Sequence, residues 1–187
     1  MRRIADSSLP AFTGLDYIIT DCATCACTLR EYQRFLPNTP ERSEAYAYFA
    51  SRVRHISQFI TDDLGLQASA FETPAALKGK KLTWHDPCHL NRHLGAKEQP
   101  RRILKSLADT EFIEMRAADR CCGMGGQFSL LNYELSQKIG EKKIESIEET
   151  DADIVVTACP GCQFQLLDGI VRMKKRQKVM NQMEVIA

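Results

Sequence analysis

The chain has 187 residues, of which 44% are hydrophobic and 26% charged, and its formal net charge at pH 7 is +1. This length allows one or two domains with a buried core, and the composition is typical of a globular protein. The small net charge excludes a general attraction to nucleic acid or anionic membranes, and no apolar run approaches the roughly 18 residues of a membrane-spanning helix.

The first part of the chain predicts one strand and one helix after an irregular start. Residues 1–14 show no periodicity and predict a loop. Residues 15–20 are rich in β-branched and aromatic types, which favour a strand. The strand ends at the cysteine-rich residues 21–27, and we expect a helix to follow through Leu29, Tyr32 and Phe35 to Pro37.

A long helix is predicted next. Thr39 and Pro40 have the residue types preferred at a helix cap and at the first helical position. Apolar residues follow at spacings of three and four, as on a helix face that packs on a core. These residues are Tyr46, Phe49, Val53, Ile56, Ile60 and Leu64. We therefore expect one helix from Pro40 to Leu64, ended by Gly65.

Strands and helices alternate through the rest of the chain. We expect strands at 82–85, 111–115, 154–156 and 185–186, and helices from 100 to about 107, from 131 to about 149 and from 164 to 176. Such alternation predicts an α/β fold of βαβ units with a parallel sheet and right-handed crossovers. Two cysteine-bearing loops leave the carboxyl ends of predicted strands, which is where open α/β sheets bind ligands.

The cysteines are the main chemical signal. Five of the eight follow the spacing C-x32-CC-x36-C-x2-C, namely Cys88, Cys121, Cys122, Cys159 and Cys162. The N-terminus has no apolar stretch typical of a secretory signal, so we expect a cytoplasmic protein that reaches the inner membrane only through partners. In a reducing compartment, clustered thiols favour a metal site over disulfides. Zinc needs only four ligands, so a fifth thiolate favours an iron–sulfur cluster, with zinc as the alternative.

Other residues near these cysteines could support a cluster. Gly123, Gly125 and Gly126 follow the cysteine pair, where glycine lets backbone amides approach and point at sulfur. A tight turn is the simpler explanation of the same glycines. His89, next to the first cysteine, is the best candidate for a hydrogen-bond donor or proton relay, whereas we expect His85 to be a hydrogen-bonding residue at a strand end.

The sequence also contains an internal repeat. Residues 16–25 align with residues 153–162 at a constant offset of 137, and in this alignment Cys22 and Cys25 coincide with the C-x2-C cysteines near the C-terminus. We therefore predict the C-terminal part of a first, incomplete cysteine-rich repeat in residues 1–65. A complete repeat follows in residues 66–187.

The first repeat lacks upstream cysteines, and two explanations are open. The chain could be a fragment or split product whose other half lies on another chain, with Cys22 and Cys25 belonging to a second, incomplete site. Alternatively, the first repeat has lost its cluster, and Cys22, Cys25 and Cys27 are vestigial. The intact C-x2-C spacing favours the first explanation.

At these positions the chain resembles the cysteine-rich CCG domain family. The family includes a subunit of heterodisulfide reductase and the iron–sulfur subunits of glycolate oxidase and respiratory lactate dehydrogenase. Its pattern is a cysteine, then CC-G, then C-x-x-C, normally present twice. The second repeat matches in full, whereas the first matches only at Cys22 and Cys25.

The resemblance implies both a cofactor and partners. The five cysteines of the complete repeat would hold a [4Fe-4S] cluster, of the non-cubane type if the site follows heterodisulfide reductase. The partners would be a flavoprotein dehydrogenase subunit and an electron acceptor of the quinone or ferredoxin type.

The main functional hypothesis is an iron–sulfur electron-transfer module. It would form the C-terminal part of the iron–sulfur subunit of a flavin-linked 2-hydroxy-acid dehydrogenase acting on lactate or glycolate. One alternative is a catalytic subunit that reduces disulfides, as in heterodisulfide reductase. Another is a zinc-stabilised interaction module without redox activity. No Ser-His-Asp set, paired carboxylates or P-loop favours a hydrolase or kinase.

Overall fold

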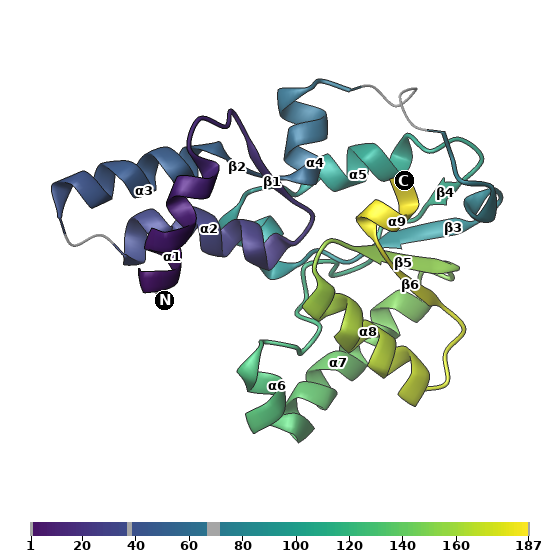
Figure 1. The fold of residues 1–187 in the computed structure, drawn as a ribbon. Helices are drawn as coiled ribbons and strands as arrows, with labels where there is room; N and C mark the ends of the chain where they lie inside the picture. The colour runs from purple at the N-terminus through teal and green to yellow at the C-terminus, as the bar shows by residue number, and fades with distance from the viewer. Residues whose placement is uncertain (1, 37–38, 67–71, 187) are drawn as a thin grey trace.

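The computed structural model describes residues 2–36, 39–66 and 72–186, which form an α/β fold with two parallel sheets (Figure 1). The larger sheet has the strand order β4-β3-β5-β6, and the smaller sheet pairs β1 with β2. All pairs in both sheets are parallel, which confirms the predicted fold class. The strands are β1 (Ile18–Thr20), β2 (Val53–His55), β3 (Lys81–Trp84), β4 (Glu111–Phe112), β5 (Ile154–Thr157) and β6 (Lys178–Asn181).

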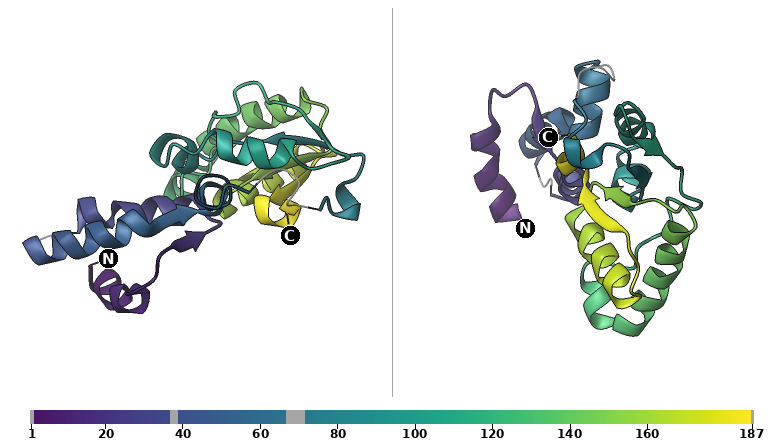
Figure 2. Two further views of the ribbon diagram at one scale, coloured as in Figure 1. Left: turned by 90° about the horizontal axis from the view of Figure 1, so that it is seen from above. Right: turned by 90° about the vertical axis from the view of Figure 1, so that its right-hand side faces the viewer.

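The helices cover both faces of the larger sheet. In the views of Figures 1 and 2, α7 and α8 lie on one face of the larger sheet and α5 lies on the other. Helices α1 to α3 extend to one side of this sheet. The α-helices are α1 (Arg2–Ser8), α2 (Ala23–Phe35), α3 (Pro40–Arg52), α4 (Ile56–Gln58), α5 (Glu98–Lys105), α6 (Gln127–Leu131), α7 (Tyr133–Glu148), α8 (Pro160–Arg172) and α9 (Gln182–Ile186). Short 3-10 turns, η1 (Leu9–Phe12) and η4 (Ala75–Leu77), and π-helical turns, η2 (Phe59–Asp63) and η5 (His89–His93), connect them.

Strand β5 lies in the middle of the larger sheet. All four of its residues are buried, as the continuous apolar run predicts for a strand covered on both faces. It pairs with β3 on one side and with β6 on the other. The carboxyl ends of β3 and β5 therefore lie side by side, and each leads into a cysteine-bearing loop.

The predicted single helix from Pro40 to Leu64 is interrupted in the structure, because a strand separates α3 from the helical segments α4 and η2. Its start is confirmed, because Thr39 caps α3 and Pro40 occupies the first position. The chain then becomes extended as β2, which pairs with β1. Val53 and His55 both face the interior in this strand, so tertiary pairing overrides an apolar spacing that also suits a helix.

Both ends of the chain differ from the prediction. Residues 2–12 form α1 and η1 instead of a loop, and Tyr46 of α3 donates a hydrogen bond to Asp6 of α1. Residues 185–186 belong to α9, and the last strand is β6, which adds to the edge of the sheet at β5. The basic residues 174–176 follow α8 instead of forming its last turn.

Candidate metal centre

Six cysteines line a cavity of about 390 Å³ at the carboxyl ends of β3 and β5. They are Cys22, Cys88, Cys121, Cys122, Cys159 and Cys162. Five of these are the cysteines of the predicted C-x32-CC-x36-C-x2-C site. The structure therefore brings the predicted ligands together, although they span 75 residues of the sequence.

Cys22 joins this cavity instead of belonging to a separate site. The backbone amide of Ala23 donates to the carbonyl of Ala158 at 2.8 Å, so the loop at Cys22 lies directly against the loop at Cys159. Cys25 is exposed and is not among the lining residues. The sequence predicts that Cys22 and Cys25 belong to one site. In the structure, Cys22 instead lines the same cavity as the five cysteines of the predicted spacing.

Cys27 lies apart from the cavity. Its thiol is buried near Glu31 and His93, with one potential ligand atom from each residue within 4.8 Å of the others. Burial, reinforced by the carboxylate of Glu31, raises the pKa of the Cys27 thiol. Cys27 is therefore a neutral side chain of the packing between α2 and η5.

The sulfurs around the cavity interact with one another. Hydrogen bonds from Cys121 and Cys162 lower the pKa of Cys122, and hydrogen bonds from Cys162 and Cys22 lower the pKa of Cys159. The same contacts raise the pKa values of Cys162, Cys22 and Cys121. Hydrogen bonding among these sulfurs therefore favours the thiolate form at Cys122 and Cys159.

Backbone dipoles favour negative charge at this site. Cys22 and Cys159 are the N-cap residues of α2 and α8, each a 13-residue helix. The partial positive charge of a helix N-terminus stabilises an anion placed there. In addition, the amides of Cys25 and Gly123 donate to Cys22 Sγ at 3.4 Å and to Cys121 Sγ at 3.3 Å.

His89, the candidate donor or proton relay of the sequence, contacts Cys159 indirectly through Thr24. Its Nδ1 lies 3.0 Å from Thr24 Oγ1, which in turn lies 3.3 Å from Cys159 Sγ. If Cys159 is the thiolate, Thr24 donates to the sulfur and accepts the proton of His89 Nδ1. This arrangement connects the imidazole to a ligand sulfur through one hydroxyl group.

The glycines after the cysteine pair do not share one role. Gly125 and Gly126 line the cavity. Gly123 has φ of +97°, and a Cβ there would lie 2.4 Å from the carbonyl oxygen of Ser136. Gly123 is therefore required for the close packing of the cysteine loop on α7.

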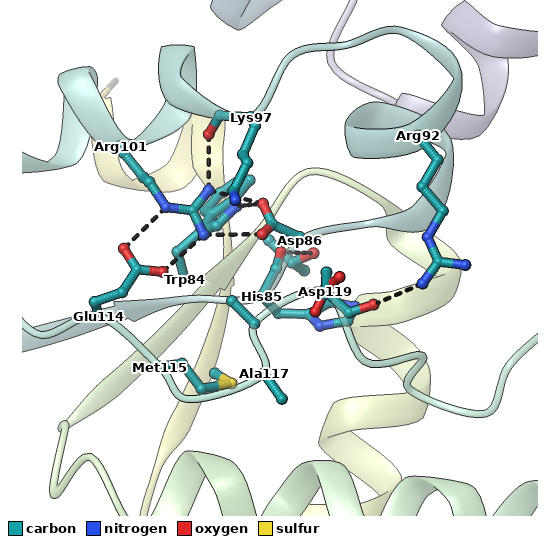
Figure 3. Close-up of polar contacts among 12 residues, drawn as sticks. Trp84, His85, Asp86, Arg92, Lys97, Arg101, Glu114, Met115, Ala117 and Asp119 are labelled. Atoms are coloured by element: carbon teal, nitrogen blue, oxygen red, sulfur yellow. Dashed lines mark hydrogen bonds and ion pairs between the residues drawn. The ribbon is translucent and has the colours of Figure 1, made fainter.

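A buried ionic network holds the first cysteine loop. The guanidinium of Arg101 forms two hydrogen bonds to the carboxylate of Asp86, at 2.9 and 2.8 Å. Figure 3 shows Arg101 between Asp86 and Glu114, beneath the carbonyl of Lys97. Trp84 Nε1 also donates to Asp86 at 2.7 Å. Because Asp86 lies two residues before Cys88, this network fixes the path of the loop.

A buried lysine lies behind the cysteine pair. Lys143 is fully buried in α7 and donates to the carbonyl oxygens of Ala117 and Ala118 at 2.8 and 3.0 Å. Burial lowers its pKa to about 8, while attraction to the Cys122 thiolate opposes that shift. At neutral pH the side chain of Lys143 is protonated in most molecules. Its positive charge partly compensates the anionic sulfurs.

His85 is the site residue that differs most from the sequence expectation. It follows β3 and lines the cavity, but neither ring nitrogen has a hydrogen-bond partner among the residues that the structure describes. One ring nitrogen and the sulfurs of Cys122 and Cys162 lie within 4.8 Å of one another. The spacing His85-x2-Cys88 is the signal that points to this position, although Pro87 excludes a helical arrangement of the two residues.

The residues at this site fit a soft metal or an iron–sulfur cluster. Thiolates are the donors that such groups prefer. The cavity adds helix N-termini, sulfur-directed amides and an imidazole without partners in the described part of the chain. A bound metal group would account for the convergence of so many sulfurs.

Comparisons with known proteins agree with the geometry. Residues 82–167 match the CCG family, described as a cysteine-rich domain. The chain is 35% identical over 174 residues to the probable glycolate oxidase iron–sulfur subunit of Bacillus subtilis, covering 91% of the chain and 38% of that protein. It is 34% identical over 176 residues to lactate utilization protein A of Geobacillus thermodenitrificans, covering 94% of the chain and 72% of that protein.

A third relative carries a different name. One subunit of the fumarate reductase (CoM/CoB) of Methanothermobacter marburgensis is 34% identical over 178 residues, covering 94% of the chain and 33% of that protein. The chain therefore spans 38% and 33% of the length of two of these relatives and 72% of the length of the other. Within the described residues, no helix is long and apolar enough to cross a membrane.

Proposed function

The chain belongs to the CCG cysteine-rich domain family, and from that membership we propose that it is an iron–sulfur electron-transfer module of an oxidoreductase. The observation that supports this most is the cavity lined by six cysteines, including all five of the family pattern. A bound cluster would take up and release single electrons. The protein holds the sulfurs on rigid loops and surrounds them with compensating positive charge.

The ligands would be Cys88, Cys121, Cys122, Cys159 and Cys162, and the cofactor a [4Fe-4S] cluster. Adjacent cysteines direct their side chains differently, so the pair at 121 and 122 suits two irons of one extended, non-cubane cluster. Cys159 and Cys162 supply sulfurs from the first turn of α8. His89 would adjust the charge on Cys159 through Thr24.

The oxidoreductase complex that contains this module would be a flavin-linked dehydrogenase of a small 2-hydroxy acid. This proposal follows the names of the relatives, glycolate oxidase subunit and lactate utilization protein. The module would receive electrons from a flavoprotein subunit and pass them to a quinone or a ferredoxin-type acceptor in the cytoplasm.

An exposed apolar surface on α6 and α8 supports such a partner. Leu130, Leu131, Phe164 and Val171 each expose more than 65% of their surface. Both helices begin at loops that line the cavity, so a subunit bound at the start of either helix would lie close to the cluster. Electron transfer requires that proximity.

Metal analysis of anaerobically purified protein tests the proposal. We expect about four irons and four sulfides per chain, with an EPR signal in one oxidation state. One zinc without sulfide would contradict electron transfer and favour the interaction module. A Cys25→Ser variant is a matched control, because its thiol is exposed outside the cavity.

A second candidate function is disulfide reduction. The sixth thiol, Cys22, lies in the cavity next to Cys159, and one relative is a subunit of a CoM/CoB-dependent enzyme. Reduction of a disulfide consumes two electrons and two protons and releases two thiols. Anaerobic protein supplied with reduced viologen and a small disulfide would oxidise the dye only if this function is present.

A further inference from the structure

His85 is a buried imidazole whose polar atoms lack partners. Only 1% of the residue is exposed, and neither Nδ1 nor Nε2 has a hydrogen-bond partner of normal geometry in the described part of the chain, although the ring lies close enough to Cys122 to lower the pKa of that thiol. Buried polar groups are nearly always paired, because an unpaired donor or acceptor loses its hydration without compensation. A group bound in the cavity would remove this deficit.

The ring faces two ligand sulfurs. A ring nitrogen, Cys122 Sγ and Cys162 Sγ lie within 4.8 Å of one another, and all three residues are buried. They come from three separate segments: the end of β3, the cysteine-pair loop and the first turn of α8. One nitrogen and two sulfurs at such separations can bind a common metal atom without large movement.

The backbone of His85 is fixed in place. The backbone amide of His85 donates to the carbonyl of Val156 at 3.0 Å. The backbone carbonyl of His85 accepts a hydrogen bond from Thr157 Oγ1 at 3.4 Å. The next amide, of Asp86, donates to the carbonyl of Ala118 at 3.0 Å. His85 is thus held against β5 and against the segment that leads to Cys121, so its ring has a defined direction.

The other buried histidine shows what a structural imidazole looks like in this protein. His55 is also fully buried, but its Nδ1 lies 2.8 Å from Ser57 Oγ and its Nε2 3.3 Å from the carbonyl oxygen of Asp21. His89 lines the cavity, yet its Nδ1 contacts Thr24. Among these three, His85 alone has both nitrogens unpaired within the described residues.

We infer that His85 is a nitrogen ligand of the metal centre, acting together with Cys122 and Cys162 on its buried side. The inference rests on the proposed function and adds to the all-cysteine ligand set that the family pattern implies. An imidazole is a neutral donor, so the metal atom that His85 binds carries less negative ligand charge than it would with a thiolate in that position. This shifts the reduction potential upward, as histidine ligands do in Rieske clusters.

Pulsed EPR on anaerobically reconstituted protein is the first test. We expect a strong ¹⁴N coupling of a directly bound imidazole, converted to the ¹⁵N pattern in protein labelled with ¹⁵N-histidine. The His85→Gln variant should lose the coupling, and the matched control His89→Gln should keep it. A cluster with full iron and sulfide but only weak nitrogen couplings would overturn the inference while leaving the proposed function intact.

His85→Cys keeps the test informative if His85→Gln fails to retain iron. The new thiolate should restore iron and sulfide, abolish the nitrogen coupling and shift the potential downward. A nitrogen coupling that persists in His85→Cys would contradict ligation by His85.

Cobalt(II) bound to the reduced, metal-free protein gives a test that does not depend on a cluster. X-ray absorption should show a mixed nitrogen and sulfur shell in the wild type and His89→Gln, with the nitrogen lost in His85→Gln and His85→Cys. An all-sulfur shell in the wild type would overturn the inference. Absence of iron and sulfide in the first experiment would instead contradict the proposed function.

Discussion

The two C-x2-C segments have matching local structure in different surroundings. Helix α2 covers Ala23–Phe35 and helix α8 covers Pro160–Arg172, so both ends differ by the sequence offset of 137. In each unit a short parallel strand ends at a cysteine, which is the N-cap of the helix that follows. The repeat in the sequence is therefore also a repeat in the backbone.

The surroundings determine how the cysteines are buried. Strand β5 is central in a four-stranded sheet and buried throughout, whereas β1 pairs with one strand and is only partly buried. Accordingly Cys159 and Cys162 are buried, Cys22 is half-buried and Cys25 is exposed. The comparison teaches that local sequence forms the strand–cysteine–helix unit, whereas the layers around it decide which thiols can serve as buried ligands.

Serine substitutions in the two segments should have the largest difference in effect. We expect Cys159→Ser and Cys162→Ser to lose nearly all bound iron, because both sulfurs face the cavity. Cys22→Ser should reduce iron content partially, and Cys25→Ser should leave it unchanged. Iron and sulfide content per chain measures this order. Equal losses in all four variants would show that the two segments bind metal equivalently.

The second prediction compares an ion pair beside β3 of the larger sheet with an ion pair at β2 of the smaller sheet. Arg101→Met removes the partner of a carboxylate whose side chain is 1% exposed. We expect the free energy of unfolding to fall by about 3–5 kcal/mol, since Asp86 is left as an uncompensated buried charge. Arg54→Met, which breaks the more exposed pair with Asp63, should cost about 0–1 kcal/mol. Urea denaturation at pH 7 measures both variants, and similar losses would contradict the comparison.

Two glycines of the cysteine-pair loop test whether the close packing of this loop on α7 excludes a side chain. Gly123→Ala should destabilise the protein by about 3 kcal/mol, because the new Cβ meets the carbonyl of Ser136 and φ is positive. Gly126→Ala has no atom within 4 Å of the added Cβ, so its cost should be about 2 kcal/mol, from the strained backbone at φ 61° and ψ −118° alone. Thermal unfolding of both variants isolates the steric contribution. Indistinguishable values would show that the loop moves away from α7.

The smallest predicted effect concerns His55, which joins β2 to the loop at Cys22. Its Nε2 donates to the carbonyl of Asp21, and burial lowers its pKa to about 4. The unfolded state, with a histidine pKa near 6.5, therefore binds more protons between pH 6.5 and 4. Stability from the neutral imidazole is full above pH 6.5 and is lost as pH falls, by about 2 kcal/mol at pH 5.

A His55→Gln variant checks this pH dependence. It should be less stable than the wild type at pH 7, and the difference should shrink by about 2 kcal/mol at pH 5. His93→Gln, an exposed substitution on η5, serves as the control. An unchanged difference between the two pH values would rule out a neutral His55 in the folded protein.

The sequence by itself determined the fold class and the central cysteines. Alternating strand and helix patterns predicted parallel strands, because each periodicity reflects side-chain geometry within one element. The spacing of five cysteines predicted a site at strand ends, and those five thiols line the cavity. The cap at Thr39 and the strand at Ile154–Thr157 were also predictable, since both depend on neighbouring residues only.

Only the tertiary structure decided which other groups reach the site. Val53–His55 pairs as a strand because β1 lies beside it, although its apolar spacing suits a helix equally well. Cys22 enters the cavity because Ala23 bonds to Ala158, a contact across 135 residues. His85 is buried at the cavity, without hydrogen-bond partners of normal geometry among the described residues, because its backbone bonds to Val156 of the distant strand β5. Each outcome depends on contacts between distant segments, and local sequence patterns carry no information about such contacts.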